Sequence, residues 1–403
     1  MDGDLQTIRV DRGAEKIIRQ LEAVGYEAFA VGGCVRDALL GNQPADWDIT
    51  TNARPETVKS LFPRTFDTGI EHGTVTVMDG SVGYEVTTYR IDGEYLDHRR
   101  PESVSFAGTL YEDVARRDFT INAMACHPDK GIMDFFSGRE DLRKRLIRCV
   151  GDPEKRFEED ALRMLRAVRF SAKLDFDIEP STWDAIGKRA KTLAAVSKER
   201  IMEELTKTLL SDHPEKLELA EKAGLTASFA EAWKQGLRPD YADLRKVPAE
   251  RVLRFSVLLQ HVDPSKASIL LRQLKADNDL RNGVVHLLEH LREEAPEDGE
   301  QMRRWLSKVG RDHLRDLLLL RVACGVDTEE KKEQLRNLAE QEKNSAVTLA
   351  ELDIDGRVLI KEGAAQGKEI GEALTYLLDK VLGEPSFNER EKLIDLYRNM
   401  ARR

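Results

Sequence analysis

The chain of 403 residues is 41% hydrophobic and 34% charged, and its formal net charge is −10. This composition fits a soluble globular protein, and the length exceeds a single hydrophobic core, so we expect about two to four domains. No apolar run approaches the roughly 20 residues needed to cross a bilayer, which excludes a helical membrane protein, and the acidic balance argues weakly against a nucleic-acid-binding protein.

The first residues and the cysteines bear on the cellular compartment. Met1-Asp2-Gly3-Asp4 is acidic and lacks the charged-then-apolar layout of a signal peptide. The four cysteines are scattered and form neither a CxxC pair nor a disulfide framework. A reducing cytoplasm is therefore the predicted location. The cysteines are Cys34, Cys126, Cys149 and Cys324.

Basic residues gather in one stretch of this acidic chain, and they could present a basic face to a nucleic acid. The alternative is a solvated helix face whose charges pair with neighbouring Glu and Asp. The stretch alone does not separate these two interpretations. Its members are Arg139, Arg143, Lys144, Arg145, Arg148, Lys155, Arg156, Arg163, Arg166, Arg169 and Lys173.

A strand, a glycine pair and a helix form the first pattern that carries chemistry. After an amphipathic helix predicted over 11–25, residues 27–31 predict a short buried strand. Gly32-Gly33 breaks that strand, and residues 34–40 predict a helix. Glycines let the backbone approach an anion, and N–H groups at a helix start point at phosphate oxygens, which Arg36 could also reach. The alternative is an ordinary turn.

Two acids follow in the segment Asp46-Trp-Asp-Ile-Thr50, which predicts a strand. Side chains alternate across a strand, so Asp46 and Asp48 share one face, where like charges repel. A cation between them would relieve this repulsion, and Mg²⁺ commonly uses one or two carboxylates together with substrate phosphates. The alternative is an edge strand with two solvated acids.

Two more strands are predicted over 72–78 and 84–89, joined by a turn at Asp79-Gly80. Glu85 alternates with its neighbours and points away from their face. A third carboxylate on a neighbouring strand would complete a two-metal site for in-line displacement of pyrophosphate. The alternative is a solvent-facing strand residue.

Residues 91–114 are polar and little periodic, and they predict a mobile loop. The adjacent Arg116 and Arg117 follow it, and their guanidinium groups could clamp triphosphate oxygens. The alternative is a helix surface on which both arginines pair with Glu112 and Asp113.

From about residue 139 the pattern is helical to the end of the chain. Asp152-Pro153 predicts the start of a helix that continues through Phe170. On it, a polar stripe recurs every third residue. A further helix starts after Ser197 as N-cap. The stripe consists of Asp160, Arg163, Arg166 and Arg169.

One helical pattern points to a different chemistry. His286-Leu-Leu-Glu289-His290 fits the H-x-x-E-H form of zinc proteases, and two histidines four apart on a helix can share a metal. No third ligand from elsewhere is evident in the sequence, so an ordinary charged helix is the favoured interpretation.

Taken together, the motifs resemble the DNA-polymerase-beta-like nucleotidyltransferase superfamily and, within it, the bacterial class II tRNA CCA-adding nucleotidyltransferases. The resemblance is dense over residues 20–210 and continues around Asn388-Glu-Arg-Glu-Lys392. The matching segments are Val31–Gly41, Asp46–Thr50, Arg116–Ala123, Gly138–Leu142, Arg156–Arg163 and Ser197–Arg200.

The resemblance implies an α+β catalytic head, with a small mixed sheet and flanking helices, followed by an all-α neck, body and tail. The implied boundaries are 1–145 for the head, 146–210 for a nucleotide-selecting neck, 211–290 for the body and 291–403 for a tRNA-binding tail. The implied activity is addition of C, C and A to tRNA 3′ ends from CTP and ATP, without a nucleic-acid template and with release of pyrophosphate. The resemblance is compatible with a homodimer.

The resemblance also implies the site residues. Asp46 and Asp48 would bind Mg²⁺, with Glu85 as the third catalytic acid. The implied nucleotide-binding residues are Gly33, Arg36, Arg117, Asp160, Arg163, Arg166 and Arg169.

Base selection has a physical rationale. On their pairing edge, cytosine and adenine present an amino donor beside a ring-nitrogen acceptor, whereas uracil and guanine present the opposite order. A carboxylate such as Asp160 with the donor Arg163 three residues later would match C and A and reject U and G.

Several related functions remain as alternatives. A CC-adding enzyme lacks part of the loop before the double arginine, whereas 91–114 is intact here and includes Asp97, Arg99 and Arg100. An A-adding enzyme is harder to exclude. A bacterial poly(A) polymerase would carry a long basic tail, and this chain ends in only Arg402-Arg403. A binding module with a decayed site conflicts with the complete acid set, and a zinc hydrolase is the most distant alternative.

Overall fold

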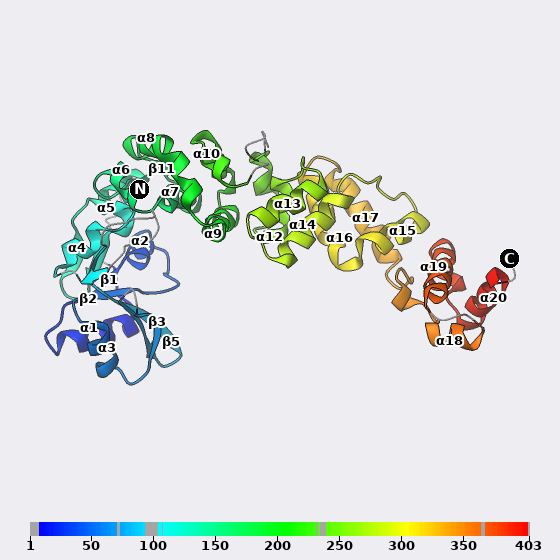
Figure 1. Cartoon of the computed structure of the whole chain (residues 1–403), viewed down its shortest axis with the longest axis horizontal. Helices are drawn as coiled ribbons and strands as arrows, with labels where there is room; N and C mark the ends of the chain where they lie inside the picture. Colours follow the sequence, from blue (N-terminus) through cyan, green and yellow to red (C-terminus); the bar gives the residue numbers. More distant parts are fainter. Residues whose placement is uncertain are drawn as a thin grey trace. The chain divides into compact units, whose positions relative to one another are not determined.

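The computed structural model describes residues 8–70, 73–92, 104–106, 108–230, 233, 239–363 and 367–401. The chain divides into two compact units, and Figure 1 labels elements of both. The first unit contains Met1–Tyr241 with Gln273–Lys275, and the second contains Ala242–Arg272 with Ala276–Arg403. Among the described residues, no helix is long and apolar enough to cross a membrane.

A seven-stranded mixed sheet with the order β3-β4-β5-β2-β1-β8-β9 forms the scaffold of the first unit. β2 and β5 run parallel, and the other neighbouring pairs are antiparallel. The predicted mixed sheet is confirmed. The strands are β1 (Ala28–Val31), β2 (Ile49–Thr51), β3 (Thr65–Gly69), β4 (Thr74–Asp79), β5 (Val82–Thr88), β8 (Met124–His127) and β9 (Gly131–Asp134).

The predicted hairpin before the double arginine is present as β4 and β5. Asp79 pairs with Val82, so the tight turn lies between them, as the Asp-Gly sequence predicts. Along β5, Tyr84 and Val86 are buried and Glu85 is exposed. This alternation confirms that Glu85 points away from the face of its neighbours.

Helices flank the sheet and close the core of the head. The carboxylate of Asp11 caps the first helix by accepting hydrogen bonds from the N–H groups of Gly13 at 2.8 Å and Ala14 at 3.3 Å. One core cluster joins Phe29 of β1 to Leu110 of the fourth helix. The helices are α1 (Arg12–Glu22), α2 (Gly33–Leu39), α3 (Pro55–Leu61), α4 (Leu110–Ala115) and α5 (Gly138–Lys144).

The predicted strand over 46–50 is wrong at its beginning. Asp46–Asp48 is irregular backbone, and β2 begins only at Ile49. The partner strand β1 ends at Val31, where Gly32 turns the chain, so the last link is the hydrogen bond from Val31 N to Asp48 O at 2.9 Å. Asp46 and Asp48 therefore lie immediately before β2 and are not part of a strand.

The predicted loop over 91–114 is also partly wrong. β6 (Arg90–Asp92) pairs with β7 (Val104–Phe106), and α4 begins at Leu110 behind a capping box formed by Thr109 and Glu112. Asp97, Arg99 and Arg100 lie outside the described residues.

Helices dominate after the head, with two corrections to the prediction. A two-stranded parallel pair, β10 (Leu146–Ile147) with β11 (Asp177–Ile178), interrupts them. The single helix predicted through 160 is two helices, because Asp160 adopts an extended conformation (φ −144°, ψ 103°). The helices of this region are α6 (Pro153–Glu159), α7 (Leu162–Leu174), α8 (Pro180–Arg189), α9 (Lys198–Leu209) and α10 (Glu218–Lys222).

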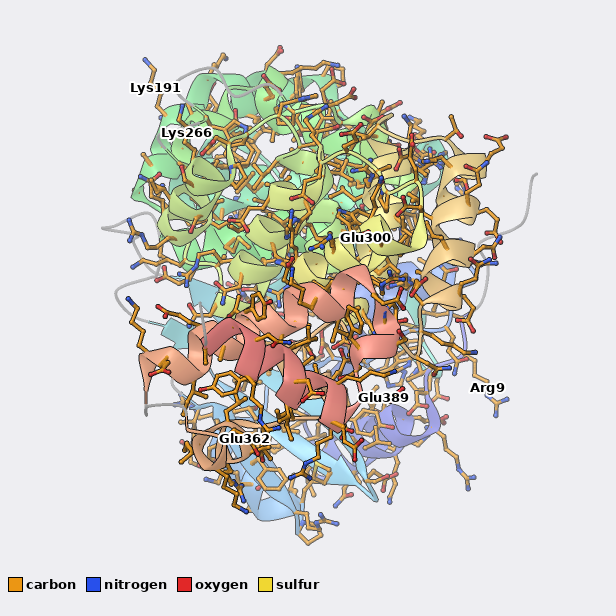
Figure 2. All side chains as sticks on the ribbon, turned by 90° about the vertical axis from the view of Figure 1, so that its right-hand side faces the viewer. Arg9, Lys191, Lys266, Glu300, Glu362 and Glu389 are labelled. Carbon is orange, nitrogen blue, oxygen red and sulfur yellow. The ribbon has the colours of Figure 1, made fainter. Side chains whose placement is uncertain are left out.

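The second unit is helical throughout its described part, as predicted. Charged side chains such as Lys266 and Glu300 project outward from its ribbon (Figure 2), while leucines such as Leu270, Leu287 and Leu317 are buried. This division of side chains is what amphipathic helices require. The α-helices are α12 (Arg251–Leu258), α13 (Pro264–Gln273), α14 (Asn278–His290), α15 (Gly299–Val309), α16 (Arg311–Ala323), α17 (Glu329–Gln341), α18 (Gly356–Lys361), α19 (Lys368–Gly383) and α20 (Arg390–Ala401).

Candidate active site

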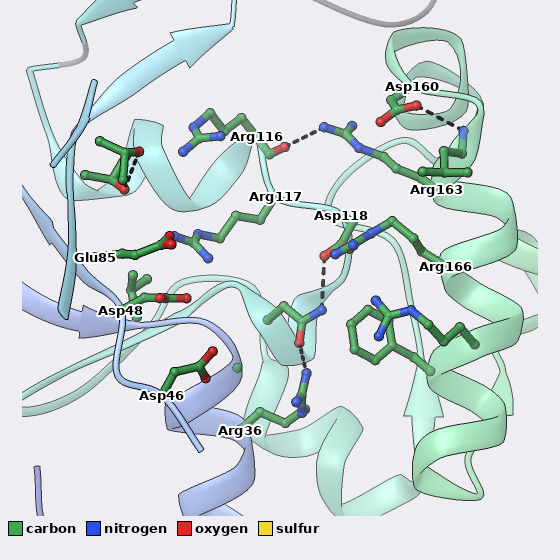
Figure 3. A pocket seen from close by; sticks show the side chains of 18 of the residues that line it. Arg36, Asp46, Asp48, Glu85, Arg116, Arg117, Asp118, Asp160, Arg163 and Arg166 are labelled. Atoms are coloured by element: carbon green, nitrogen blue, oxygen red, sulfur yellow. Dashed lines mark hydrogen bonds and ion pairs between the residues drawn. The ribbon is translucent and has the colours of Figure 1, made fainter. Parts of the chain in front are cut away.

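A polar cavity of about 660 Å³ lies within the first unit, and every predicted site residue lines it. Figure 3 shows the acids of the head on one side of this cavity and residues of α7 on the other. Residues more than a hundred positions apart in sequence are therefore brought together. The predicted residues are Gly33, Arg36, Asp46, Asp48, Glu85, Arg117, Asp160, Arg163, Arg166 and Arg169.

Three carboxylates occupy the sheet side of the cavity. Asp46 and Asp48 immediately precede β2, and Glu85 lies on β5, the parallel neighbour of β2. The register pairs Ile49 with Val86, so Asp48 and Glu85 occupy equivalent positions just before this pair. Figure 3 shows the three side chains close to one another.

The neighbouring acids change the pKa of Asp48. Burial and the nearby charges of Asp46 and Glu85 raise the pKa of Asp48 to about 6, against a smaller opposing effect of Arg117. The charge of Arg117 therefore does not offset the effect of burial and of the neighbouring acids on Asp48. Carboxylate oxygens are the ligands of hard divalent cations, so the donor set fits such an ion.

The glycine turn lies directly against an arginine of the site. Gly32 has φ 87° and ψ −127°, which only glycine adopts without strain. A Cβ atom on Gly32 would lie 2.7 Å from Nη1 of Arg117, so the missing side chain also makes room for this guanidinium. Gly33 follows as the first residue of α2, whose Arg36 is buried at 3% exposure.

Arg116 and Arg117 share a buried partner in Asp113. The carboxylate lies 2.9 Å from Nη2 of Arg116 and 3.7 Å from Nη2 of Arg117, and it accepts a hydrogen bond from Thr50 at 2.9 Å. Burial alone would raise the pKa of Asp113, but the two arginines hold it below its usual value. The alternative that both arginines pair with Asp113 is thus correct. Glu112, the other predicted partner, instead forms the capping box at the start of α4. Both arginines nevertheless line the cavity.

A hydrogen-bonded chain of residues that line the cavity connects α2 to α7. Arg36 donates to Asn122 at 2.6 Å, Asn122 donates to Asp118 at 3.1 Å, and Arg166 donates to Asp118 at 2.6 and 2.8 Å. Burial would raise the pKa of Asp118, but Arg166 and the Asn122 hydrogen bond lower it to about 2. Asp118 therefore remains ionised and orients Arg166.

Arg169 is fixed by α9 and by a neighbouring ring. Its Nε donates to Glu204 at 2.6 Å, and its guanidinium lies 4.1 Å from the centroid of the Phe170 ring. Lys173, one turn further along α7, is exposed at the edge of the cavity. Both interpretations of the basic stretch, a face for binding and a set of charges paired with acids, thus apply. Several of its members pair with acids and also line the cavity.

Asp160 contacts an arginine other than the predicted one. Arg200 of α9 donates to Oδ1 at 3.3 Å and to Oδ2 at 2.7 Å, and Oδ1 also accepts from the N–H of Leu162 at 3.0 Å. The guanidinium of Arg163 is buried and donates to the carbonyl of Arg116 at 3.0 Å and to Glu159 at 2.5 Å. The donor found beside the Asp160 carboxylate is therefore Arg200.

Sequence reasoning missed the residues that hold the arginines in place. Three of them lie within the segments that carry the resemblance, but the sequence predicts no role for them. They are Asp118, Asn122 and Arg200. Glu204 stands outside every motif, and only its spacing on the helix after Ser197 could have hinted at a partner for a basic stripe.

Family models match most of the chain in three consecutive segments. Residues 28–148 match the poly(A) polymerase head domain. Residues 175–237 match a domain described as a probable RNA- and SrmB-binding site of polymerase A, and residues 249–397 match tRNA nucleotidyltransferase domain 2.

Relatives of known function resemble the chain over nearly its whole length. The CCA-adding enzyme of Lactobacillus helveticus is 38% identical over 379 residues, covering 92% of each chain. That of Limosilactobacillus reuteri is 38% identical over 400 residues, covering 95% of each chain. The crystal structure of the Bacillus stearothermophilus CCA-adding enzyme in complex with CTP superposes with a TM-score of 0.85 at 35% identity, covering 96% of this chain and 97% of that one. The chain therefore belongs to the family of CCA-adding enzymes.

Proposed function

We propose that this protein is a CCA tRNA nucleotidyltransferase that adds and repairs the 3′-terminal C, C and A of tRNA. It uses CTP and ATP, needs no nucleic-acid template and releases pyrophosphate. The observation that carries the proposal is the single cavity that joins three carboxylates to a row of arginines and to Asp160. Its relatives of known function bear the name of this activity over nearly the full length of the chain.

The acids supply the transfer chemistry in this proposal. Asp46 and Asp48 hold Mg²⁺, and Glu85 is the third catalytic carboxylate. The ion would lower the pKa of the tRNA 3′-hydroxyl and offset charge on the leaving pyrophosphate. The raised pKa of Asp48 supports this assignment, because burial and the charges of Asp46 and Glu85 disfavour its ionised form, and a bound cation would stabilise that form.

The positive side chains bind the nucleotide. Gly33 and Arg36 hold the triphosphate, where the glycine turn brings backbone close and Arg36 is buried behind it. Arg117 lies against the glycine turn and its charge acts on Asp48, so it suits the same phosphates. Arg166 and Arg169, which are oriented by Asp118 and Glu204, complete the binding surface on α7.

Asp160 reads the base, and Arg163 supports it. The carboxylate accepts the amino group that cytosine and adenine share, and it offers no donor to the carbonyl of uracil or guanine. Arg163 ties the start of α7 to the backbone of Arg116 and so contributes to the shape of this end of the cavity. A hydrogen-bonding site of this kind discriminates strongly because a wrong base leaves buried groups unpaired.

The remaining parts of the proposal concern organisation and location. Residues 1–145 form the catalytic head, 146–210 the nucleotide-selecting neck, 211–290 the body and 291–403 the tRNA-binding tail. The protein works in the cytoplasm, and the four cysteines are free thiols, which suits a reducing compartment.

The deciding experiment uses tRNAs that end at the discriminator base, at C and at CC, with CTP and ATP supplied separately and together. CTP alone should extend the first substrate by two residues, ATP alone should extend the CC-ended substrate by one, and the mixture should complete CCA on all three. An enzyme that only adds A would leave the discriminator-ended tRNA unchanged with CTP. A CC-adding enzyme would stop before the terminal A, and a poly(A) polymerase would extend with ATP beyond one residue.

A further inference from the structure

A cluster of three histidines and two glutamates lies in the second unit, apart from the active-site residues in sequence and in unit. His286, Glu289 and His290 come from the last turns of α14, and one donor atom from each lies within 4.8 Å of the others. His313, near the start of α16, packs its ring 4.6 Å from that of His286, centroid to centroid.

The backbone of a neighbouring helix fixes the tautomer of His286. Its Nε2 lies 2.7 Å from the carbonyl oxygen of Val309, the last residue of α15. A carbonyl only accepts, so Nε2 carries the proton and Nδ1 of the neutral ring keeps its lone pair. Histidines that bind metals through one nitrogen typically donate the other N–H in this way.

In His290, too, one ring nitrogen faces an acceptor. Its Nδ1 is buried, lacks a hydrogen bond of good geometry and lies 3.1 Å from Oε1 of Glu293. Glu293 is itself held through its other oxygen, which accepts a hydrogen bond from the indole of Trp305 at 3.0 Å. A proton on Nδ1 would face this carboxylate and leave Nε2 as the free donor atom.

We propose that His286, Glu289 and His290 bind a divalent transition-metal ion of the Zn²⁺ type, with water completing the coordination. Two imidazole nitrogens and one carboxylate oxygen form a set that zinc accepts. One potential ligand atom of each of the three residues lies within 4.8 Å of those of the other two, which is close enough for one ion to be shared.

The ion would act on stability rather than on catalysis. Through Val309 and His313, His286 of α14 contacts the end of α15 and the start of α16. A bound ion that fixes both rings would hold these three helices together, and an ion that binds only the folded state raises its stability. This inference is independent of the proposed function.

Zinc titration of the full-length protein tests the proposal, with millimolar Mg²⁺ present to occupy oxygen-only sites. Calorimetry should give one zinc ion per chain for the wild type, and saturating zinc should raise the melting temperature. His290→Ala should lose at least tenfold in zinc affinity and lose the shift in melting temperature. Glu289→Gln, which changes an exposed side chain, should fold normally and bind zinc more weakly than the wild type.

The matched control is His261→Ala, which removes an exposed histidine of the same unit. This variant should bind zinc like the wild type. Equal zinc affinity in the wild type, Glu289→Gln and His290→Ala would overturn the proposal, as would a wild type that takes up no zinc. Circular dichroism of each variant distinguishes loss of the site from loss of the fold.

Discussion

The guanidinium of Arg200 contacts both carboxylate oxygens of Asp160, at 3.3 Å and 2.7 Å. Arg200 lies on α9, whereas Asp160 lies in the break between α6 and α7, so this ion pair ties the break to the following helix. A carboxylate has about four lone-pair sites, so the pair leaves Asp160 able to accept a further hydrogen bond. Arg200 is thus placed to fix the direction in which Asp160 faces the cavity.

Asp160→Ala should lose discrimination against UTP and GTP more than it loses metal binding. The substitution removes the acceptor that separates the two kinds of base edge, and discrimination should fall on the order of 100-fold. Single-nucleotide extension of tRNAs that end at C and at CC, with each nucleotide in turn, measures the effect. If this variant kept full selectivity for C and A, the base-reading role of Asp160 would be wrong.

Arg200→Ala should weaken discrimination less than Asp160→Ala does, because it loosens the carboxylate without deleting it. Arg200→Lys keeps a charge but not the two-pronged geometry, so it should fall between the wild type and the alanine variant. The ratios of kcat/KM for ATP over GTP rank the three proteins. Equal ratios in all of them would show that Arg200 has no part in orienting Asp160.

Asp46→Ala and Asp48→Ala should abolish nucleotide transfer while leaving tRNA affinity nearly unchanged. Each removes one of the clustered carboxylates that fit a divalent cation. Gel-based extension and a filter-binding assay on the same preparations separate the two effects. Asp67→Ala, at an exposed acid on β3, is the matched control and should transfer normally. Near-normal transfer by Asp46→Ala would remove this residue from the metal site.

Asp118 should make the stability of the first unit depend on pH in the acid range. Its pKa is lowered from 3.8 to about 2 in the folded protein, so the ionised form is favoured by folding. The contribution is present above about pH 4 and is lost as pH falls towards about 2, and it amounts to about 2 kcal/mol. Urea unfolding of the wild type and Asp118→Asn should show a difference at pH 5 that narrows at pH 3. A difference that does not change with pH would contradict the lowered pKa.

The sequence predicted which residues line the cavity better than it predicted the residues that hold them in place. The sheet, its hairpin and the exposure of Glu85 follow from two-residue alternation and an Asp-Gly turn, which are local signals. The sequence does not predict the break at Asp160, because helix periodicity continues on both sides of it. In the structure the Asp160 carboxylate accepts hydrogen bonds from the N–H of Leu162 and from Arg200, which lies forty residues further along the chain. Partners such as Glu204 lie far from their arginines in sequence, so spacing alone could not reveal them.

Gly32→Ala should cost both stability and activity, whereas Gly25→Ala should cost stability alone. Both glycines have similar positive φ angles, 87° and 89°, which strain any residue with a Cβ. Only at Gly32 does the added Cβ meet Nη1 of Arg117, at 2.7 Å, whereas nothing lies within 4 Å of it at Gly25. Gly32→Ala should therefore displace Arg117 and raise the KM for CTP and ATP by about tenfold or more, since a hydrogen bond to a charged group contributes about 1.5–3 kcal/mol. Melting temperatures and steady-state kinetics of both variants provide the comparison. If both variants kept the wild-type KM, the contact between the glycine turn and Arg117 would have no role in nucleotide binding.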